Sequence, residues 1–363
     1  MTSQPVIGLS EFFFTGITFE PMYNADSYSI PGGWIQIKTI EMHTAGEPLR
    51  VILDGFPEIQ GTRVLDYRRF IQEHYDHLRT ALMFEPRGHA DMYGVIVTPS
   101  QVADFGVVFI HNEGYSTMCG HATLAIAKLA VEAGWVETVT PVTKITIEAP
   151  CGILTAFVHV DAGKVTQVRF LNVPSFVAAM DQSISLPKFG TIRYDLAYGG
   201  AFYAFVDAQQ FNLKLNSDHY QELIDLGMQI KRAVASAQTI AHPEEADLSF
   251  LYGTIFIDRP ESTDAHSRNV CIFAEGEVDR SPTGSGVSAR IAIHHARGEV
   301  ALNEAIPIES ILGTTFDCKV AEVVDYHGIN AVIPEVAGDA YVTGKNIFTI
   351  DPNDPLKDGF IFR

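Results

Sequence analysis

Cys119 precedes Gly120 and His121 where an apolar, alanine-rich run begins. A helix starting at Gly120 would present unpaired N–H groups and its positive dipole end to the thiol. Both effects favour the thiolate, so we expect a thiol pKa below the free value of about 8.5 and a sulfur that can act as a base. The same N–H groups could hold a carboxylate. A lone cysteine at a helix start is also commonly a buried packing residue, so spacing alone leaves both interpretations open.

A second turn resembles the one at Cys119. The segment Asp279–Gly286 contains small residues and leads into another apolar run. Two helix N-termini facing one cleft could clamp a single carboxylate and withdraw charge as the α-carbon becomes carbanion-like, which requires neither a metal nor a nicotinamide. Gly284, Gly286 and Ala289 also have the spacing of a dinucleotide-binding turn, but the preceding apolar run ends near Ala274, too early for a tight strand-to-helix turn.

The elements that must position these turns are short strands and a few helices. Helical spacing predicts helices over 66–82, 120–133, 217–236 and 284–295. Alternation and β-rich runs predict strands over 35–42, 94–98, 106–111, 144–148, 154–160, 165–171, 201–206, 270–274 and 331–334. This order is not a regular βαβ alternation, which favours a mixed α/β fold. Residues 1–34 are irregular and are interpreted as an N-terminal extension.

Composition narrows the class of protein. The chain has 363 residues, 47% of them hydrophobic, and a formal charge of −19, which disfavours nucleic-acid or anionic-membrane partners and favours a small molecule. No apolar run approaches the ~18 residues of a spanning helix, and the N-terminus lacks a basic leader, so the expected location is the cytoplasm. The four cysteines are dispersed, and His74, His77, His294 and His295 lack supporting ligands, so no metal site is expected.

Several longer motifs occur together and in order. The chain resembles the proline racemase family from about Ile35 to its end, through the segments 42–48, 85–94, 111–115 with 118–121, 197–203 and 279–286. The resemblance implies a diaminopimelate-epimerase-like fold of two similar domains, each a mixed sheet around a central helix, with the substrate between them. We expect residues 35–173 plus 347–363 to form the first domain and 174–346 the second.

Thr283 departs from the pattern that the resemblance implies for racemases. In those enzymes two cysteines face opposite sides of the α-carbon; Cys119 matches the first, and Thr283 stands where the second would be. A threonine hydroxyl is too weakly acidic to exchange protons at neutral pH, so two-base racemisation should be lost. Within the family this Cys-then-Thr arrangement is similar to members that dehydrate trans-3-hydroxy-L-proline to 1-pyrroline-2-carboxylate, without a cofactor.

The resemblance also implies residue roles. Cys119 is expected to take the α-proton, His121 and Asp279 to contact the ring amine, and the backbone N–H groups of Gly120, His121, Gly284 and Ser285 to hold the carboxylate. Thr283 either contacts the ring hydroxyl or is an inert replacement. Two alternatives stay open: a proline or 4-hydroxyproline racemase or epimerase, and a non-catalytic amino-acid-binding protein. A homodimer is a further expectation.

Overall fold

The computed structural model describes residues 27–362, and contacts divide the chain into one unit over Met1–Trp34 and another over Ile35–Arg363. Within the first unit, the described residues include a turn in which the Trp34 amide donates to the carbonyl of Pro31 at 3.4 Å. Every predicted site residue falls in the second unit.

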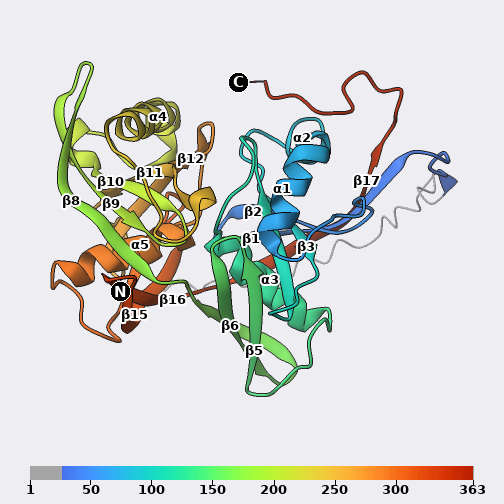
Figure 1. The fold of residues 1–363 in the computed structure, drawn as a ribbon, viewed down its shortest axis with the longest axis horizontal. Helices are drawn as coiled ribbons and strands as arrows, with labels where there is room; N and C mark the ends of the chain where they lie inside the picture. The colour runs from blue at the N-terminus through green and yellow to red at the C-terminus, as the bar shows by residue number, and fades with distance from the viewer. Residues whose placement is uncertain (1–26, 363) are drawn as a thin grey trace, which may run out of the picture. The chain divides into compact units, whose positions relative to one another are not determined.

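A first group of strands surrounds helix α3 (Gly120–Glu132), as Figure 1 shows. It comprises β1 (Ile35–Thr44), β2 (Glu47–Asp54), β3 (Gly94–Thr98), β4 (Phe105–Ile110), β5 (Val142–Ala149), β6 (Gly152–Asp161), β7 (Lys164–Leu171) and β17 (Ala340–Ile350). The last strand returns to the beginning of this group, because β17 pairs antiparallel with β1 along its whole length. Parallel pairs β2–β3 and β4–β5 among antiparallel ones make the sheet mixed.

A second group surrounds helix α5 (Gly284–Ala296). It comprises β8 (Ser175–Leu186), β9 (Gly190–Tyr198), β10 (Phe202–Asp207), β11 (Leu251–Asp258), β12 (Ser267–Phe273), β13 (Glu277–Val278), β14 (Ala305–Glu309), β15 (Thr315–Tyr326) and β16 (Ile329–Gly338). Strand β16 pairs with β7 of the first group as well as with β8 and β15 of the second, so hydrogen bonding is continuous between the groups.

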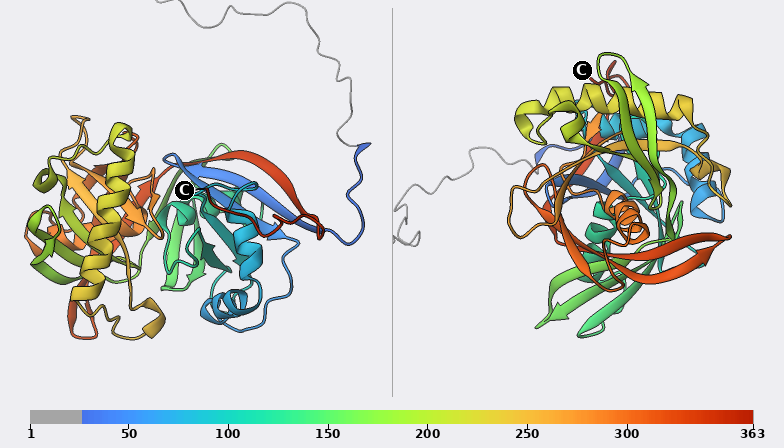
Figure 2. Two further views of the ribbon diagram at one scale, coloured as in Figure 1. Left: turned by 90° about the horizontal axis from the view of Figure 1, so that it is seen from above. Right: turned by 90° about the vertical axis from the view of Figure 1, so that its left-hand side faces the viewer.

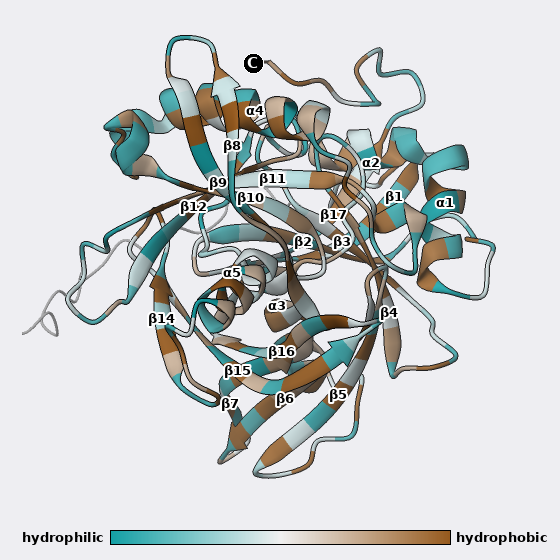
Figure 3. Cartoon of the chain, turned by 60° about the vertical axis from the view of Figure 1, so that its left-hand side comes forward, coloured by the Kyte–Doolittle hydropathy of each residue, from teal (hydrophilic) through white to brown (hydrophobic). Residues whose placement is uncertain are grey.

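The central helices α3 and α5 are buried on nearly all sides, because their sequences are apolar or small throughout rather than along one stripe. Figure 3 shows both helices inside curved strands, and residues of the two helices contact each other. Helix α4 (Tyr220–Ala237) is amphipathic instead and covers β11 and β12 from outside, as the yellow helix in Figure 2 shows. The predicted mixed α/β fold with central helices wrapped by strands is confirmed.

Two predicted helices differ from the structure, and several strands were not predicted. The predicted helix over 66–82 is two helices, α1 (Val64–His74) and α2 (Asp76–Met83), because the backbone at Tyr75 leaves the helical conformation at φ −131°. The predicted helix over 217–236 begins with a 3₁₀ turn at Ser217–His219, and further 3₁₀ turns occupy Ala208–Phe211 and Ala246–Leu248. Strands β2, β8, β9, β11, β13, β14, β15 and β17 were not predicted from the pattern.

Candidate active site

Cys119 is the N-cap of α3, as its position before Gly120 predicts. Its backbone is extended at φ −143°, and its Sγ accepts a hydrogen bond from the Ala122 amide at 3.4 Å. The side chain is 5% exposed. A cap in this conformation aims the sulfur at the free N–H groups of the first turn, which gives the thiol its place at the helix end.

His121 stands beside the thiol rather than away from it. Its Nδ1 lies 3.1 Å from the Sγ of Cys119. Burial lowers the pKa of His121 to about 3, although the nearby carbonyl of Pro48 favours the protonated ring. The resting imidazole is therefore neutral and a weaker base than an exposed histidine. A Cys–His pair is thus present within two residues of chain.

Thr283 is the N-cap of α5 and has a different local structure. Its φ of 69° is unusual for a β-branched residue and implies backbone strain of about 1–3 kcal/mol. Its amide donates to the Oγ of Ser281 at 3.1 Å. The Oγ1 is buried beside Asp279 and Cys271, and forms no hydrogen bond of normal geometry with the described residues.

The two helix starts touch through their glycines. A Cβ built on Gly120 would lie 2.4 Å from the Cα of Gly284, and one built on Gly284 would lie 2.5 Å from the Cα of Gly120. Only glycine permits this approach. The hydroxyl of Ser285, the next residue, pairs with that of Tyr203 at 2.7 Å. The two helix starts whose backbone N–H groups are expected to hold a carboxylate are therefore in direct contact.

Buried carboxyl groups lie on one side of this junction. Asp279 is 4% exposed and accepts from the Ser281 amide at 2.7 Å. Glu47 is fully buried; its Oε2 accepts from the Arg280 amide at 2.7 Å, whereas its Oε1 has no hydrogen-bond partner among the described residues. Burial raises the pKa of Glu47, and the negative charge of Asp279 raises it further; burial also raises the pKa of Asp279. A cationic ring amine would be stabilised here.

The expected low pKa of Cys119 is wrong for this structure. Burial raises the pKa of the thiol well above its ordinary value, and the charges of Asp279 and Glu47 raise it further, while the Ala122 amide opposes the change only in part. Desolvation of a full thiolate charge outweighs one hydrogen bond and a partial helix charge. The resting state is a neutral thiol facing a neutral imidazole.

Comparison with known proteins agrees with these features. The model of the proline racemase family matches residues 39–361. The chain belongs to the proline racemase family. A relative from Colwellia psychrerythraea named trans-3-hydroxy-L-proline dehydratase is 51% identical, with 95% of this chain and 96% of that protein covered. A relative from Burkholderia multivorans named 3-hydroxyproline 2-epimerase is 44% identical, with 90% and 98% covered.

A solved structure of the same family supports the fold. It is a hydroxyproline epimerase from Agrobacterium vitis with bound trans-4-hydroxy-L-proline, which superposes with a TM-score of 0.85 at 30% identity and covers 91% of this chain and 96% of its own. The predicted diaminopimelate-epimerase-like, proline racemase fold is therefore shown for this chain.

The structure brings all seven predicted site residues of this proline racemase family member together at the α3–α5 junction. Sequence reasoning missed Glu47 and Tyr93 as site residues. Both occur inside motifs that carry the family resemblance, 42–48 and 85–94, and that placement was the available signal. The Tyr93 ring lies 4.9 Å from the His121 ring, edge to face.

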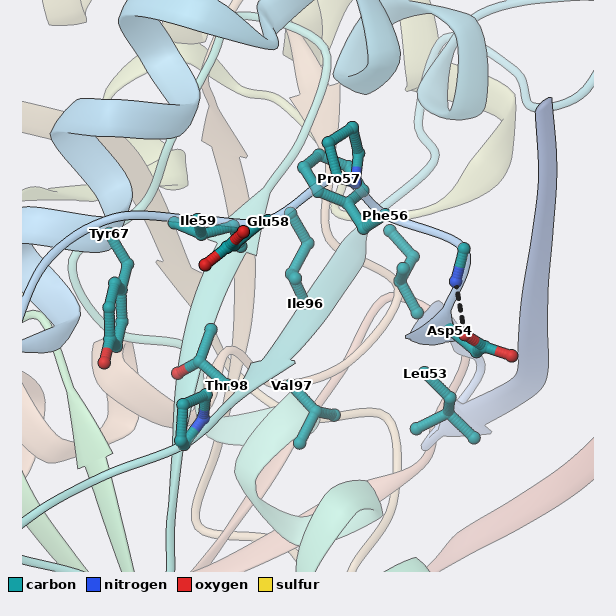
Figure 4. A pocket seen from close by; sticks show the side chains of 13 residues that line it. Leu53, Asp54, Phe56, Pro57, Glu58, Ile59, Tyr67, Ile96, Val97 and Thr98 are labelled. Atoms are coloured by element: carbon teal, nitrogen blue, oxygen red, sulfur yellow. Dashed lines mark hydrogen bonds between the residues drawn. The ribbon is translucent and has the colours of Figure 1, made fainter.

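A groove of about 330 Å³ elsewhere in the first strand group contains none of these residues. Figure 4 shows it lined by β2, the segment after it, Tyr67 and β3. His294 pairs with Glu299 at 2.6 Å. Among residues 27–362 there is no cluster of three or more His, Cys, Asp or Glu side chains suited to a metal. Within that same range, none of the helices combines the length and apolarity required to cross a membrane.

Proposed function

We propose that this protein dehydrates trans-3-hydroxy-L-proline to 1-pyrroline-2-carboxylate. The observation that carries the proposal is the asymmetry of the junction: a thiol with a histidine 3.1 Å away stands at the start of α3, and a threonine stands at the start of α5. Dehydration needs one base to remove the α-proton, whereas inversion needs a proton carrier on each face. The name of the relative at 51% identity supports the same reaction.

Binding comes first in the proposed mechanism. The substrate carboxylate accepts hydrogen bonds from the N–H groups of Gly120, His121, Gly284 and Ser285, which come from the two touching helix starts. The ring amine faces Asp279, and His121 lines the same position. Two helix N-termini on one carboxylate stabilise the negative charge that spreads from the α-carbon when its proton leaves.

Activation of Cys119 follows from binding. The resting pair is a thiol and a neutral imidazole, and a cationic ring amine beside them lowers the cost of forming the thiolate. The thiol proton passes to Nδ1 of His121, and the thiolate then takes the α-proton. Substrate binding thereby offsets the burial that raises the pKa of the free thiol.

Stereochemistry allows a single base. In trans-3-hydroxyproline the 3-hydroxyl is opposite the carboxylate and shares a ring face with the α-hydrogen, so both leave from the Cys119 side in a syn elimination. The C–H electrons form the ring double bond, the C–O bond breaks, and the leaving hydroxyl takes up a proton from an acid in the site and departs as water. The resulting enamine tautomerises to 1-pyrroline-2-carboxylate. Thr283 faces the opposite side.

The first alternative is an epimerase or racemase. One relative at 44% identity is named 3-hydroxyproline 2-epimerase, so similarity alone does not separate the reactions. An epimerase would need a proton carrier behind Thr283, where the buried Cys271 is the nearest thiol. The second alternative, an amino-acid-binding protein, needs no proton acceptor beside Cys119.

The direct test is incubation of the purified protein with trans-3-hydroxy-L-proline without an added cofactor, followed by detection of products by NMR. The proposal predicts 1-pyrroline-2-carboxylate. Recovery of only the inverted isomer would support the epimerase, and recovery of unchanged, bound substrate would support the binding protein.

Three further expectations stay predictions: a cytoplasmic location, a homodimer, and two domains formed by residues 35–173 plus 347–363 and by residues 174–346.

A further inference from the structure

Tyr93 carries a buried hydroxyl that the steps above do not use. The residue directly precedes β3, and its side chain is 2% exposed. The hydroxyl lies close to the side chains of Cys119, Ser116 and Tyr252, but it forms no hydrogen bond of normal geometry with any described residue. A buried hydroxyl without a well-formed hydrogen bond in a native structure calls for a functional explanation.

The Tyr93 ring borders the catalytic pair. It packs edge to face on His121 with centroids 4.9 Å apart, and it lies 6.1 Å from the ring of Phe273 on the opposite strand group. The phenol stands beside the Cys119 thiol and favours its ionised form. Tyr93 therefore occupies the Cys119 side of the junction, where a hydroxyl that shares a face with the α-hydrogen would leave.

We propose that the Tyr93 hydroxyl donates the proton that converts the departing 3-hydroxyl into water. This inference rests on the proposed dehydration. The C3–O bond breaks as the Tyr93 O–H bond breaks, and a new O–H bond completes the water molecule. The Cys119 thiol, which has just gained the α-proton, then returns a proton to the phenolate. The thiolate and the phenol are both regenerated, so the step needs no further reactant.

The protonation state suits a donor. Burial raises the pKa of Tyr93 well above its ordinary value, so the phenol keeps its proton at neutral pH. A buried phenolate would be a stronger base than the thiolate nearby, which drives the proton back from Cys119 to Tyr93 after water has formed.

A second buried phenol, Tyr252, is the nearest competitor for this role. Its hydroxyl also forms no hydrogen bond of normal geometry with the described residues, and it lies close to the side chains of Tyr93 and Ser116. Its ring, however, stacks on Phe273 at 5.4 Å and meets Tyr203 at 5.7 Å, and these contacts place it on the second strand group. Tyr93 is the one of the two that packs against His121.

The test separates loss of water from loss of proton abstraction. Wild type, Tyr93→Phe and Tyr67→Phe are each given trans-3-hydroxy-L-proline in deuterated water, with formation of 1-pyrroline-2-carboxylate followed by NMR. In parallel, α-deuterium uptake into L-proline reports abstraction from a ligand that lacks the leaving hydroxyl. Tyr67 is a matched control, because it is a buried tyrosine beside the separate groove of Figure 4.

For Tyr93→Phe we expect dehydration to fall by about 10²-fold or more, the usual effect of a lost general acid. Exchange into L-proline should fall much less, because it loses only the help of the phenol in ionising Cys119. Tyr67→Phe should match wild type in both assays. Dehydration by Tyr93→Phe at the wild-type rate, or equal loss of dehydration and exchange, would overturn the inference. Absence of product with wild type would instead overturn the proposed function and is visible before any substitution is made.

Discussion

The starts of α3 and α5 occupy equivalent positions in the two strand groups, yet they differ in what they offer a proton. At α3 the cap is a regular extended residue whose sulfur accepts from an amide at 3.4 Å and faces a histidine nitrogen at 3.1 Å. At α5 the cap is strained at φ 69°, and its hydroxyl has no hydrogen-bond partner among the described residues.

In this fold, the backbone groups that bind a carboxylate and the side chains that transfer a proton are therefore independent of each other. Gly120 and Gly284 make the two helix starts alike where they meet, so both can contribute N–H groups to binding. The caps themselves differ, because the α3 cap is a thiol with a histidine nitrogen 3.1 Å away, whereas the α5 cap is a threonine hydroxyl. Substitutions at the two helix starts test this difference between them.

The largest effect is expected for Cys119→Ser. A serine hydroxyl is a far weaker acid than a thiol, so the alkoxide base is not formed at neutral pH, and turnover should fall by about 10²–10⁴-fold or more. Calorimetric binding of trans-3-hydroxy-L-proline should persist, because the amides of the clamp are unchanged. Turnover at the wild-type rate would remove the thiol from the mechanism.

His121→Asn should have the next largest effect. It removes the nitrogen that accepts the thiol proton, so kcat should fall by about 10²-fold. Because burial raises the pKa of the free thiol, the wild-type kcat/KM should increase with pH as the thiol loses its proton. Without His121 that rise should move to higher pH. A profile identical to wild type would show that His121 does not help to ionise Cys119.

Thr283→Cys should add a smaller, new activity. A second thiol on the opposite face could return a proton there, and incubation in deuterated water should then yield inverted substrate with deuterium at the α-carbon. Thr283→Ser is the matched control, since it keeps a hydroxyl of the same weak acidity and should give no inversion. Inversion by both variants, or by the serine variant alone, would contradict the role of the thiol.

The smallest effect is expected for Cys271→Ala. This buried cysteine lies next to Thr283, and burial raises its pKa well above the ordinary value, so it should remain a neutral packing residue. The rate of dehydration measured by NMR should match wild type, apart from a loss of stability from the small cavity. If wild type inverts any substrate, loss of that inversion in this variant would identify Cys271 as a second proton carrier and contradict the single-base account.

The difference between the two helix starts could largely be predicted from the sequence, because Cys119 and Thr283 are different residue types and each precedes an apolar helix. The thiol pKa could not be, since it depends on how completely residues from distant strands bury the sulfur and on the charge of Glu47. The break at Tyr75 was also hidden, because the helical spacing continues across it. The missed strand β17 is exposed or half-buried along both faces except at its two ends, so its sequence lacks the alternation that marks a strand with one buried face.

The most direct test of the central claim follows one reaction of the wild-type protein with trans-3-hydroxy-L-proline in deuterated water by NMR. If a single base on the Cys119 face acts, the product is 1-pyrroline-2-carboxylate, and any deuterium in recovered substrate is found with retained configuration. Accumulation of cis-3-hydroxy-D-proline labelled at the α-carbon, without the ring imine, would contradict the account.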